Sequence, residues 1–141
     1  MADGFDFSEM EEFTRQLMDL AVQRMPRESK KFLRDEGNKL KKDTKAKAKQ
    51  KVKKDKGIYQ KSIKRGKVYK FNGNQLSIRT YSNAPHAHLI EHGHRIIGKD
   101  GSEHGFKQGE HVFEDSVREF HDKFISDVED FVDEMLEQGL R

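Results

Sequence analysis

The chain has 141 residues, no cysteine and only 33% hydrophobic residues. Without cysteine it cannot form a disulfide or use a thiolate nucleophile, and its length suits a single domain over residues 1–141. No apolar run approaches the roughly 20 residues that a membrane-spanning helix needs, and the acidic N-terminus has no apolar signal core, so we expect a soluble intracellular protein with a small core and no membrane contact.

Charge is strongly segregated along the sequence, although the formal net charge is only +3. Between Arg24 and Lys70 there are 20 basic and 5 acidic residues, whereas the rest of the chain holds 8 basic and 20 acidic residues. This pattern favours contact between the basic middle and the acidic ends, within one chain or between neighbouring copies. Nucleic acid is the competing partner for the basic stretch.

The first predicted element is an amphipathic helix that begins near Ser8. Ser8 can cap this helix, and Glu11 and Glu12 suit its first turn. Its apolar residues recur every three to four positions, which is typical of a packing helix; they are Met10, Phe13, Leu17, Leu20 and Ala21. Pro26 interrupts this pattern and can begin a second helix.

The second helix, from Pro26 to about Lys54, is rich in lysine and poor in large apolar residues. Between Lys39 and Lys56 there are ten lysines and two aspartates, and lysine forms helices well without burial. We therefore expect the helical region over residues 8–56 to end in a solvated, lysine-rich arm. The simpler interpretation is a soluble surface, and the functional one is contact with DNA or an acidic partner through Lys45, Lys49 and Lys53.

A β-hairpin is predicted next. Gly57 ends the second helix, and residues 58–63 form a short turn of helix or strand. Two alternating strands, over residues 67–71 and 75–81, flank a turn at residues 72–74 whose asparagines and glycine favour left-handed conformations. This is the clearest strand pairing in the sequence.

A short helix and a glycine corner complete the region over residues 57–97. Proline suits the first turn of a helix, so Pro85–His92 is predicted to form about two helical turns, which Gly93 stops. The helix holds Glu91 beside this corner. A further strand is expected to begin at residues 95–97.

The last part of the chain is predicted to be a loop followed by the longest helix. Four glycines and few apolar residues indicate a mobile loop over residues 98–109, a length that is usually functional or disordered. Over residues 110–138 an apolar stripe rich in phenylalanine faces away from crowded acidic residues, so this helix should supply most of the core against a small sheet and the first helix. The predicted fold class is α+β: a small antiparallel β-sheet packed against a long C-terminal helix and an N-terminal helix, with a long lysine-rich second helix.

One stretch has the spacing of a zinc peptidase motif. His88-Leu-Ile-Glu91-His92 fits the H-x-x-E-H pattern, in which two histidines on a helix bind zinc and the glutamate activates water. The third protein ligand is unassigned, although Glu103 and Glu110 lie downstream. A zinc-dependent hydrolase is therefore one alternative function.

The same histidines also have simpler interpretations. Together with His86 and His94, His88 and His92 can bind a metal without catalysis or respond to pH. The simplest interpretation is that they are polar residues on an exposed short helix, with Glu91 capping the local turn. On that interpretation we expect no cofactor.

Two motifs resemble those of a phage protein family. These proteins, the small head–tail joining or tail-completion proteins of long-tailed phages, have a Gly-x-Leu-x-x-Ser-Ile-like element, a hairpin, a Tyr…Ala-x-x-x-Glu-x-Gly-Thr segment, a variable loop and a C-terminal helix. The present sequence resembles this order, with His94 in place of the threonine. The matching positions are Gly57, Ser62, Ile63, Tyr81, Ala87, Glu91 and Gly93.

This resemblance implies a non-enzymatic virion protein, assembled in the bacterial host cytoplasm. It would form a homo-oligomeric ring at the head–tail junction as a connector, tail terminator or minor tail component. Its implied partners are phage connector or head-completion proteins and tail proteins, with non-specific DNA contact in the channel. A basic nucleic-acid-binding module remains an alternative function.

Overall fold

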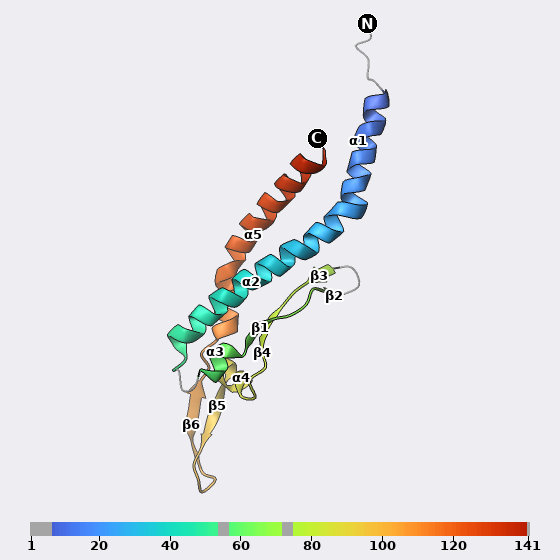
Figure 1. Cartoon of the computed structure of the whole chain (residues 1–141). Helices are drawn as coiled ribbons and strands as arrows, with labels where there is room; N and C mark the ends of the chain where they lie inside the picture. Colours follow the sequence, from blue (N-terminus) through green and yellow to red (C-terminus); the bar gives the residue numbers. More distant parts are fainter. Residues whose placement is uncertain (1–6, 54–56, 72–74, 141) are drawn as a thin grey trace.

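The fold is α+β, as predicted. Two long helical segments lie side by side, and three two-stranded antiparallel ribbons lie beside them and beyond one end (Figure 1). The computed structural model describes residues 7–53, 57–71 and 75–140. No helix in these described ranges is long and apolar enough to cross a membrane.

The N-terminal half of the chain forms one continuous bent rod. Helix α1 (Phe7–Asp19) passes through a π-helical turn, η1 (Leu20–Arg24), into α2 (Met25–Lys51), and the residues flanking the turn keep right-handed helical angles. Pro26 lies in the first turn of α2 as predicted, but the predicted interruption is wrong. A proline ring clashes with the carbonyl four residues earlier in a regular α-helix, and the wider π turn relieves this clash. Figure 1 shows the rod bending at this turn.

Both ends of the rod differ from the prediction. Ser8 lies within α1, because the helix already includes Phe7, so Ser8 does not precede the helix as a cap. At the other end α2 stops at Lys51, and Val52 is extended, with φ −109° and ψ 125°. Gly57 therefore does not end α2. Gly57 instead lies immediately before the short helix α3 (Ile58–Lys61), with a left-handed φ of +74°.

Helix α5 (Val112–Gly139) packs antiparallel against α2 through aromatic side chains. The ring of Phe32 stacks on Phe131 with 4.6 Å between centroids and lies 6.2 Å from that of Phe124. The prediction that α5 packs mainly against the sheet and the first helix is therefore wrong. Its main partner is the lysine-rich helix.

The lysine-rich half of α2 is consequently not a solvated arm. Thr44 and Ala48 are fully buried. These small residues let neighbouring elements approach the helix closely, while the long lysine side chains extend along its flanks. Small residues add little to an apolar stripe, so the sequence pattern did not indicate that this half of α2 is packed.

The predicted hairpin is present but divided into two ribbons. Strand β2 (Tyr69–Phe71) pairs with β3 (Gln75–Ser77), and β1 (Ile63–Arg65) pairs with β4 (Thr80–Ser82). The predicted turn at residues 72–74 lies outside the described residues. The ribbons are therefore separate small sheets rather than one sheet with long strands.

The break between β3 and β4 lies where the ribbon meets α2. A Cβ atom on Gly37 would lie only 3.0 Å from Ile78 Cδ1 and from Arg65 Cγ. A glycine inside a helix costs stability but permits close contact. Here it lets Ile78 pack down onto α2, which takes that residue out of the strand.

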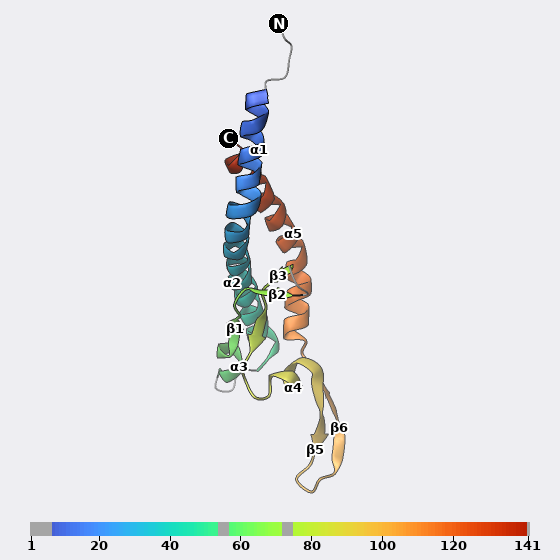
Figure 2. The ribbon, with the colours of Figure 1, turned by 90° about the vertical axis from the view of Figure 1, so that its right-hand side faces the viewer.

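The chain between the second ribbon and α5 forms a short helix and a projecting hairpin. Helix α4 (Ala87–His92) is the predicted short helix, and Gly93, with φ +87°, ends it. Strand β5 (Gly93–Ile97) pairs with β6 (Glu103–Gln108) in a hairpin that extends away from the body (Figure 2). The predicted loop over residues 98–109 is therefore wrong for its second half. All residues of β6 are exposed, so no alternating burial pattern marks the strand.

Candidate functional site: a glycine corner that holds the last helix

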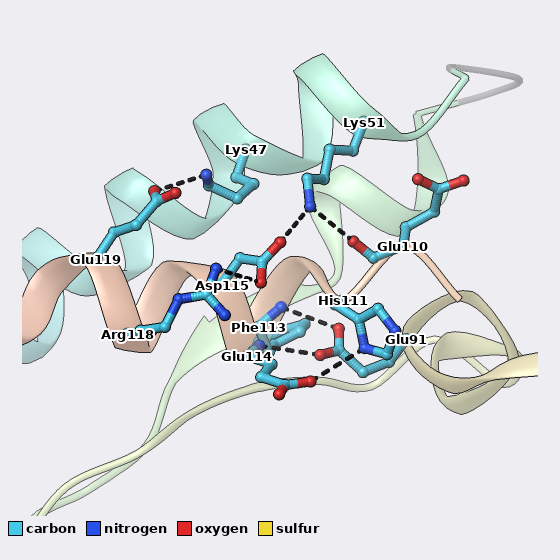
Figure 3. A network of polar contacts seen from close by, with 10 residues as sticks. All are labelled: Lys47, Lys51, Glu91, Glu110, His111, Phe113, Glu114, Asp115, Arg118 and Glu119. Atoms are coloured by element: carbon cyan, nitrogen blue, oxygen red, sulfur yellow. Dashed lines mark hydrogen bonds and ion pairs between the residues drawn. The ribbon is translucent and has the colours of Figure 1, made fainter. Parts of the chain in front are cut away.

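Glu91 holds the beginning of α5. The residue before this helix, His111, has a left-handed φ of +50° and gives no side-chain cap. Glu91, which is only 8% exposed, accepts hydrogen bonds from the backbone N–H groups of Phe113 and Glu114, each at 2.9 Å (Figure 3). A carboxylate satisfies the free N–H groups of a first turn and interacts favourably with the helix dipole. The predicted role of Glu91 as a cap of its own turn is therefore corrected, because it caps a different helix.

Two glycines allow the segments on either side of the β5–β6 hairpin to touch. A Cβ atom on Gly93 would lie 2.4 Å from the carbonyl oxygen of Lys107, and one on Gly109 would lie 2.3 Å from that of Glu91. The two residues after Gly109 donate their N–H groups to carbonyls of α4 at 2.7 and 3.2 Å. We call Glu91, Gly93 and Gly109 the glycine corner. Gly109 was not among the predicted site residues.

The first predicted motif supports this corner from α3 and β1. The Ser62 hydroxyl donates to the carbonyl of Tyr59 at 2.5 Å and is hydrogen-bonded to the Ser82 hydroxyl, which links α3 to β4. Ile63 is fully buried. The apolar core at this place consists of Ala48, Tyr59, Ile63 and Val112, with Val52, Ala87, Ile90 and Phe113 packed against it.

Two tyrosines have places that the sequence did not indicate. Tyr59 is 7% exposed, and its hydroxyl has no hydrogen-bond partner among the described residues. Burial, and then the Glu91 carboxylate, raise the pKa of Tyr59 to about 12, so it stays neutral. Tyr81, by contrast, is a predicted motif residue that lies outside the corner. It is 40% exposed on β4, with the guanidinium of Arg79 at 5.7 Å from its ring centre.

The H-x-x-E-H residues do not come together as a zinc ligand set. His88 and His92 are exposed, while Glu91 is turned toward α5. Glu103, one of the acidic residues downstream of the motif, pairs with Arg95 at 2.9 Å in the hairpin. Within the described ranges, ligand atoms approach one another to within 4.8 Å in the set Glu91, His111 and Glu114. These are the residues that a metal ion would contact, but both Glu91 oxygens already accept backbone N–H groups.

Lysines of α2 and carboxylates of α5 form a ladder along the line where these helices meet. Each step of four or eight residues forward in α2 is matched by the same step backward in α5, as antiparallel helices require. The pairs are Lys39–Asp127 at 3.0 Å, Lys47–Glu119 at 2.6 Å and Lys51–Asp115, the last two drawn in Figure 3. The hydrogen bond from Lys51 lowers the pKa of Asp115. Basic and acidic parts of the sequence thus meet within the chain, one of the two predicted arrangements.

Glu36 is an ionisable group buried beside this ladder. It is 2% exposed, and its carboxylate lies 3.2 Å from Lys39 Nζ, which also binds Asp127. Burial raises the pKa of Glu36, and the nearby Asp127 carboxyl group adds to the increase. A carboxyl group whose pKa is raised by folding costs stability when ionised. That cost disappears as the pH falls through the raised pKa.

Replacing Glu36 with glutamine should therefore stabilise the protein. Near neutral pH we expect the free energy of unfolding of Glu36→Gln to rise by about 1 kcal/mol. The gain should shrink toward about pH 4, where the wild-type carboxyl group is protonated. Urea unfolding at both pH values measures the effect, with Glu11→Gln on the exposed side of α1 as the control. A loss of stability at neutral pH would mean that the ion pair with Lys39 outweighs the cost of burial.

The three candidate lysines do not share one surface. Lys45 and Lys49 lie on the side of α2 away from α5, in a shallow groove with Lys42. Lys53 follows the end of α2 and lines a different groove, together with His86 and His94. A spacing of four residues keeps side chains on one face only within a helix, and α2 ends before Lys53.

The sequence matches a known protein family. The family model "Bacteriophage HK97-gp10, putative tail-component" matches residues 11–93, more than half of the chain. The match includes both predicted motifs and ends at Gly93, before α5. Comparisons with curated proteins and with solved structures gave no match. The predicted relation to the phage head–tail and tail-completion proteins is thus confirmed, and the chain belongs to the HK97-gp10-like family of bacteriophage tail components.

Proposed function

We propose that the chain is a structural subunit of the phage head–tail junction that forms an oligomeric ring and docks the tail to the capsid. It would be a virion protein assembled in the bacterial host cytoplasm, without enzymatic activity. The family supplies the broader role of a phage tail component. The finer role rests on how the motif is used: Glu91, its acidic residue, caps α5 instead of facing a substrate. A rigid scaffold of this kind suits a subunit whose outer surfaces bind neighbours.

The β5–β6 hairpin is the surface that we assign to docking with connector, head-completion or tail proteins. It extends away from the body (Figure 2), and Ile97 and Phe106 on it are 55% and 52% exposed. A two-stranded ribbon is only marginally stable alone in water, and its edges are free to pair with another strand. A neighbouring virion protein that covers these apolar side chains would stabilise the hairpin.

Non-specific DNA binding is a second candidate function. The observation that favours it is the groove on α2 lined by Lys42, Lys45 and Lys49. Lysine contacts to phosphate are independent of sequence, as contact with DNA in a channel requires. Binding to duplex DNA that weakens steeply with added salt would support this role.

The proposed function is tested by tail joining. Lysates of a phage that lacks this protein should contain DNA-filled heads and complete tails that remain separate. Adding the purified protein should restore joined particles, which electron microscopy counts. Normal particles made without the protein would contradict the proposal, as would a failure of the folded wild-type protein to restore joining.

Two hairpin variants sharpen this test. Ile97→Ser combined with Phe106→Ser should leave the fold intact but prevent the protein from restoring joined particles, because the docking surface loses its apolar side chains. Ile58→Ser is the control, since Ile58 is 61% exposed and belongs to α3, not to the hairpin. Full restoration by the double variant would remove the hairpin from the docking surface and leave the function itself untouched.

A further inference from the structure

The outer side of α5 carries an apolar stripe that no described residue covers. Three of its side chains, Ile125, Val132 and Leu136, are 43%, 39% and 43% exposed. Spacings of seven and four residues place them on one side of the helix. Exposed acidic residues flank the stripe without an ion-pair partner in the described part of the chain. Together these residues form the acidic face: Asp122, Glu129, Asp133, Ile125, Val132 and Leu136.

The outer side of α2 carries the opposite charge. Lys42, Lys45 and Lys49 share one side of this helix, and we call them the basic face. None of the three pairs with an acidic group among the described residues, unlike the lysines of the ladder. Helix α2 holds eleven basic and four acidic residues, and α5 holds two and ten. The ladder therefore pairs only some of the basic residues of α2 with some of the acidic residues of α5 and leaves others on the two outer faces.

We propose that the basic face of one copy binds the acidic face of the next copy. Lys42 and Lys49 are seven residues apart, as are Asp122 and Glu129. In both helices this separation spans about 10.5 Å, so two ion pairs form together when the helices lie side by side. The aliphatic stems of the lysines would cover the apolar stripe. The contact joins different faces, so a pair of copies still has one free basic face and one free acidic face, and further copies add until a ring closes.

A second copy explains more of the surface than DNA does. DNA would satisfy the basic face but would be repelled by the acidic face, and it would leave the apolar stripe exposed to water. The ladder inside the chain already shows lysines of α2 pairing with carboxylates of α5. The proposed contact repeats this chemistry between copies. It rests on the proposed ring assembly and names the two surfaces that build the ring.

Charge reversal tests the contact directly. Lys42→Glu with Lys49→Glu reverses the basic face, and Asp122→Lys with Glu129→Lys reverses the acidic face. Sedimentation of the purified full chain at low salt should show that either reversal weakens self-association by on the order of tenfold or more. A chain that carries all four changes, or an equal mixture of the two reversed chains, should associate again. Lys61→Glu with Lys64→Glu is the control, with the same change in net charge outside α2 and wild-type association expected.

The outcomes separate this inference from the proposed function. Wild-type association in the reversed chains, or a wild-type chain that stays monomeric at every concentration, overturns the contact. Loss of duplex DNA binding in the basic-face variant without a change in association overturns it in favour of DNA. If the reversed chains associate normally and still restore tail joining, only the surface assignment fails. If charge reversal weakens association as expected but the wild-type chain cannot restore joining, the proposed function fails while the contact stands.

Discussion

Replacing Glu91 with alanine is expected to lower the free energy of unfolding by about 2 to 4 kcal/mol. The change leaves the N–H groups of Phe113 and Glu114 without an acceptor at a partly buried place. It also removes a negative charge from the positive end of the α5 dipole. Urea unfolding followed by circular dichroism measures the loss.

Two further variants assign this loss to the cap. Glu91→Gln keeps one acceptor oxygen and should lose about half as much stability as Glu91→Ala. His92→Ala changes an exposed neighbour on the same helix and should stay within about 0.5 kcal/mol of the wild type. If Glu91→Ala unfolds at the wild-type urea concentration, the cap does not hold α5 in place.

Replacing Gly109 with alanine is expected to cost more than about 3 kcal/mol and to lower Tm by about 10 °C. A Cβ atom at this position would lie 2.3 Å from the carbonyl oxygen of Glu91 and 2.6 Å from the carbonyl carbon of His92. Backbone atoms cannot rotate away as a side chain can, so α4 must separate from the segment that enters α5. Thermal unfolding followed by circular dichroism measures the effect.

A second glycine separates this steric clash from backbone strain. Gly101 lies in the turn of the β5–β6 hairpin with φ +84°, and a Cβ atom there would meet nothing within 4 Å. Gly101→Ala should therefore lower the free energy of unfolding by only about 1 to 2 kcal/mol, the cost of a left-handed conformation for a residue with a Cβ atom. Equal losses for the two variants would show that the close approach at Gly109 is not what joins the two segments.

Elements with a strong apolar period could be predicted from the sequence. The repeat in residues 110–138 indicated α5, and Gly93 marked the end of the short helix, which begins at Ala87 and not at Pro85 as predicted. The packing partner of α5 could not be predicted in this way. The buried side of α2 is made of small residues such as Thr44 and Ala48, whose burial adds little to a hydrophobic pattern.

Only part of the glycine corner could be predicted from the sequence. Glu91 and Gly93 stand close together in a recognisable motif, but the N–H groups that Glu91 binds lie more than twenty residues further along the chain. In the sequence Gly109 resembles the other glycines of the predicted loop, because the carbonyl group of α4 that requires a glycine here is brought near only by the fold. Strand β6 was missed because it is exposed throughout. Contacts between distant segments leave no local period, so sequence reasoning could name the corner but not its partner.

The measurement that tests the central claim most directly is the position of this protein in the intact virion. A gold label on the chain should appear in electron micrographs at the junction between capsid and tail, with several labels around each junction. A label found along the tail tube, at the distal tip, or on no mature particle would contradict a role in joining head and tail.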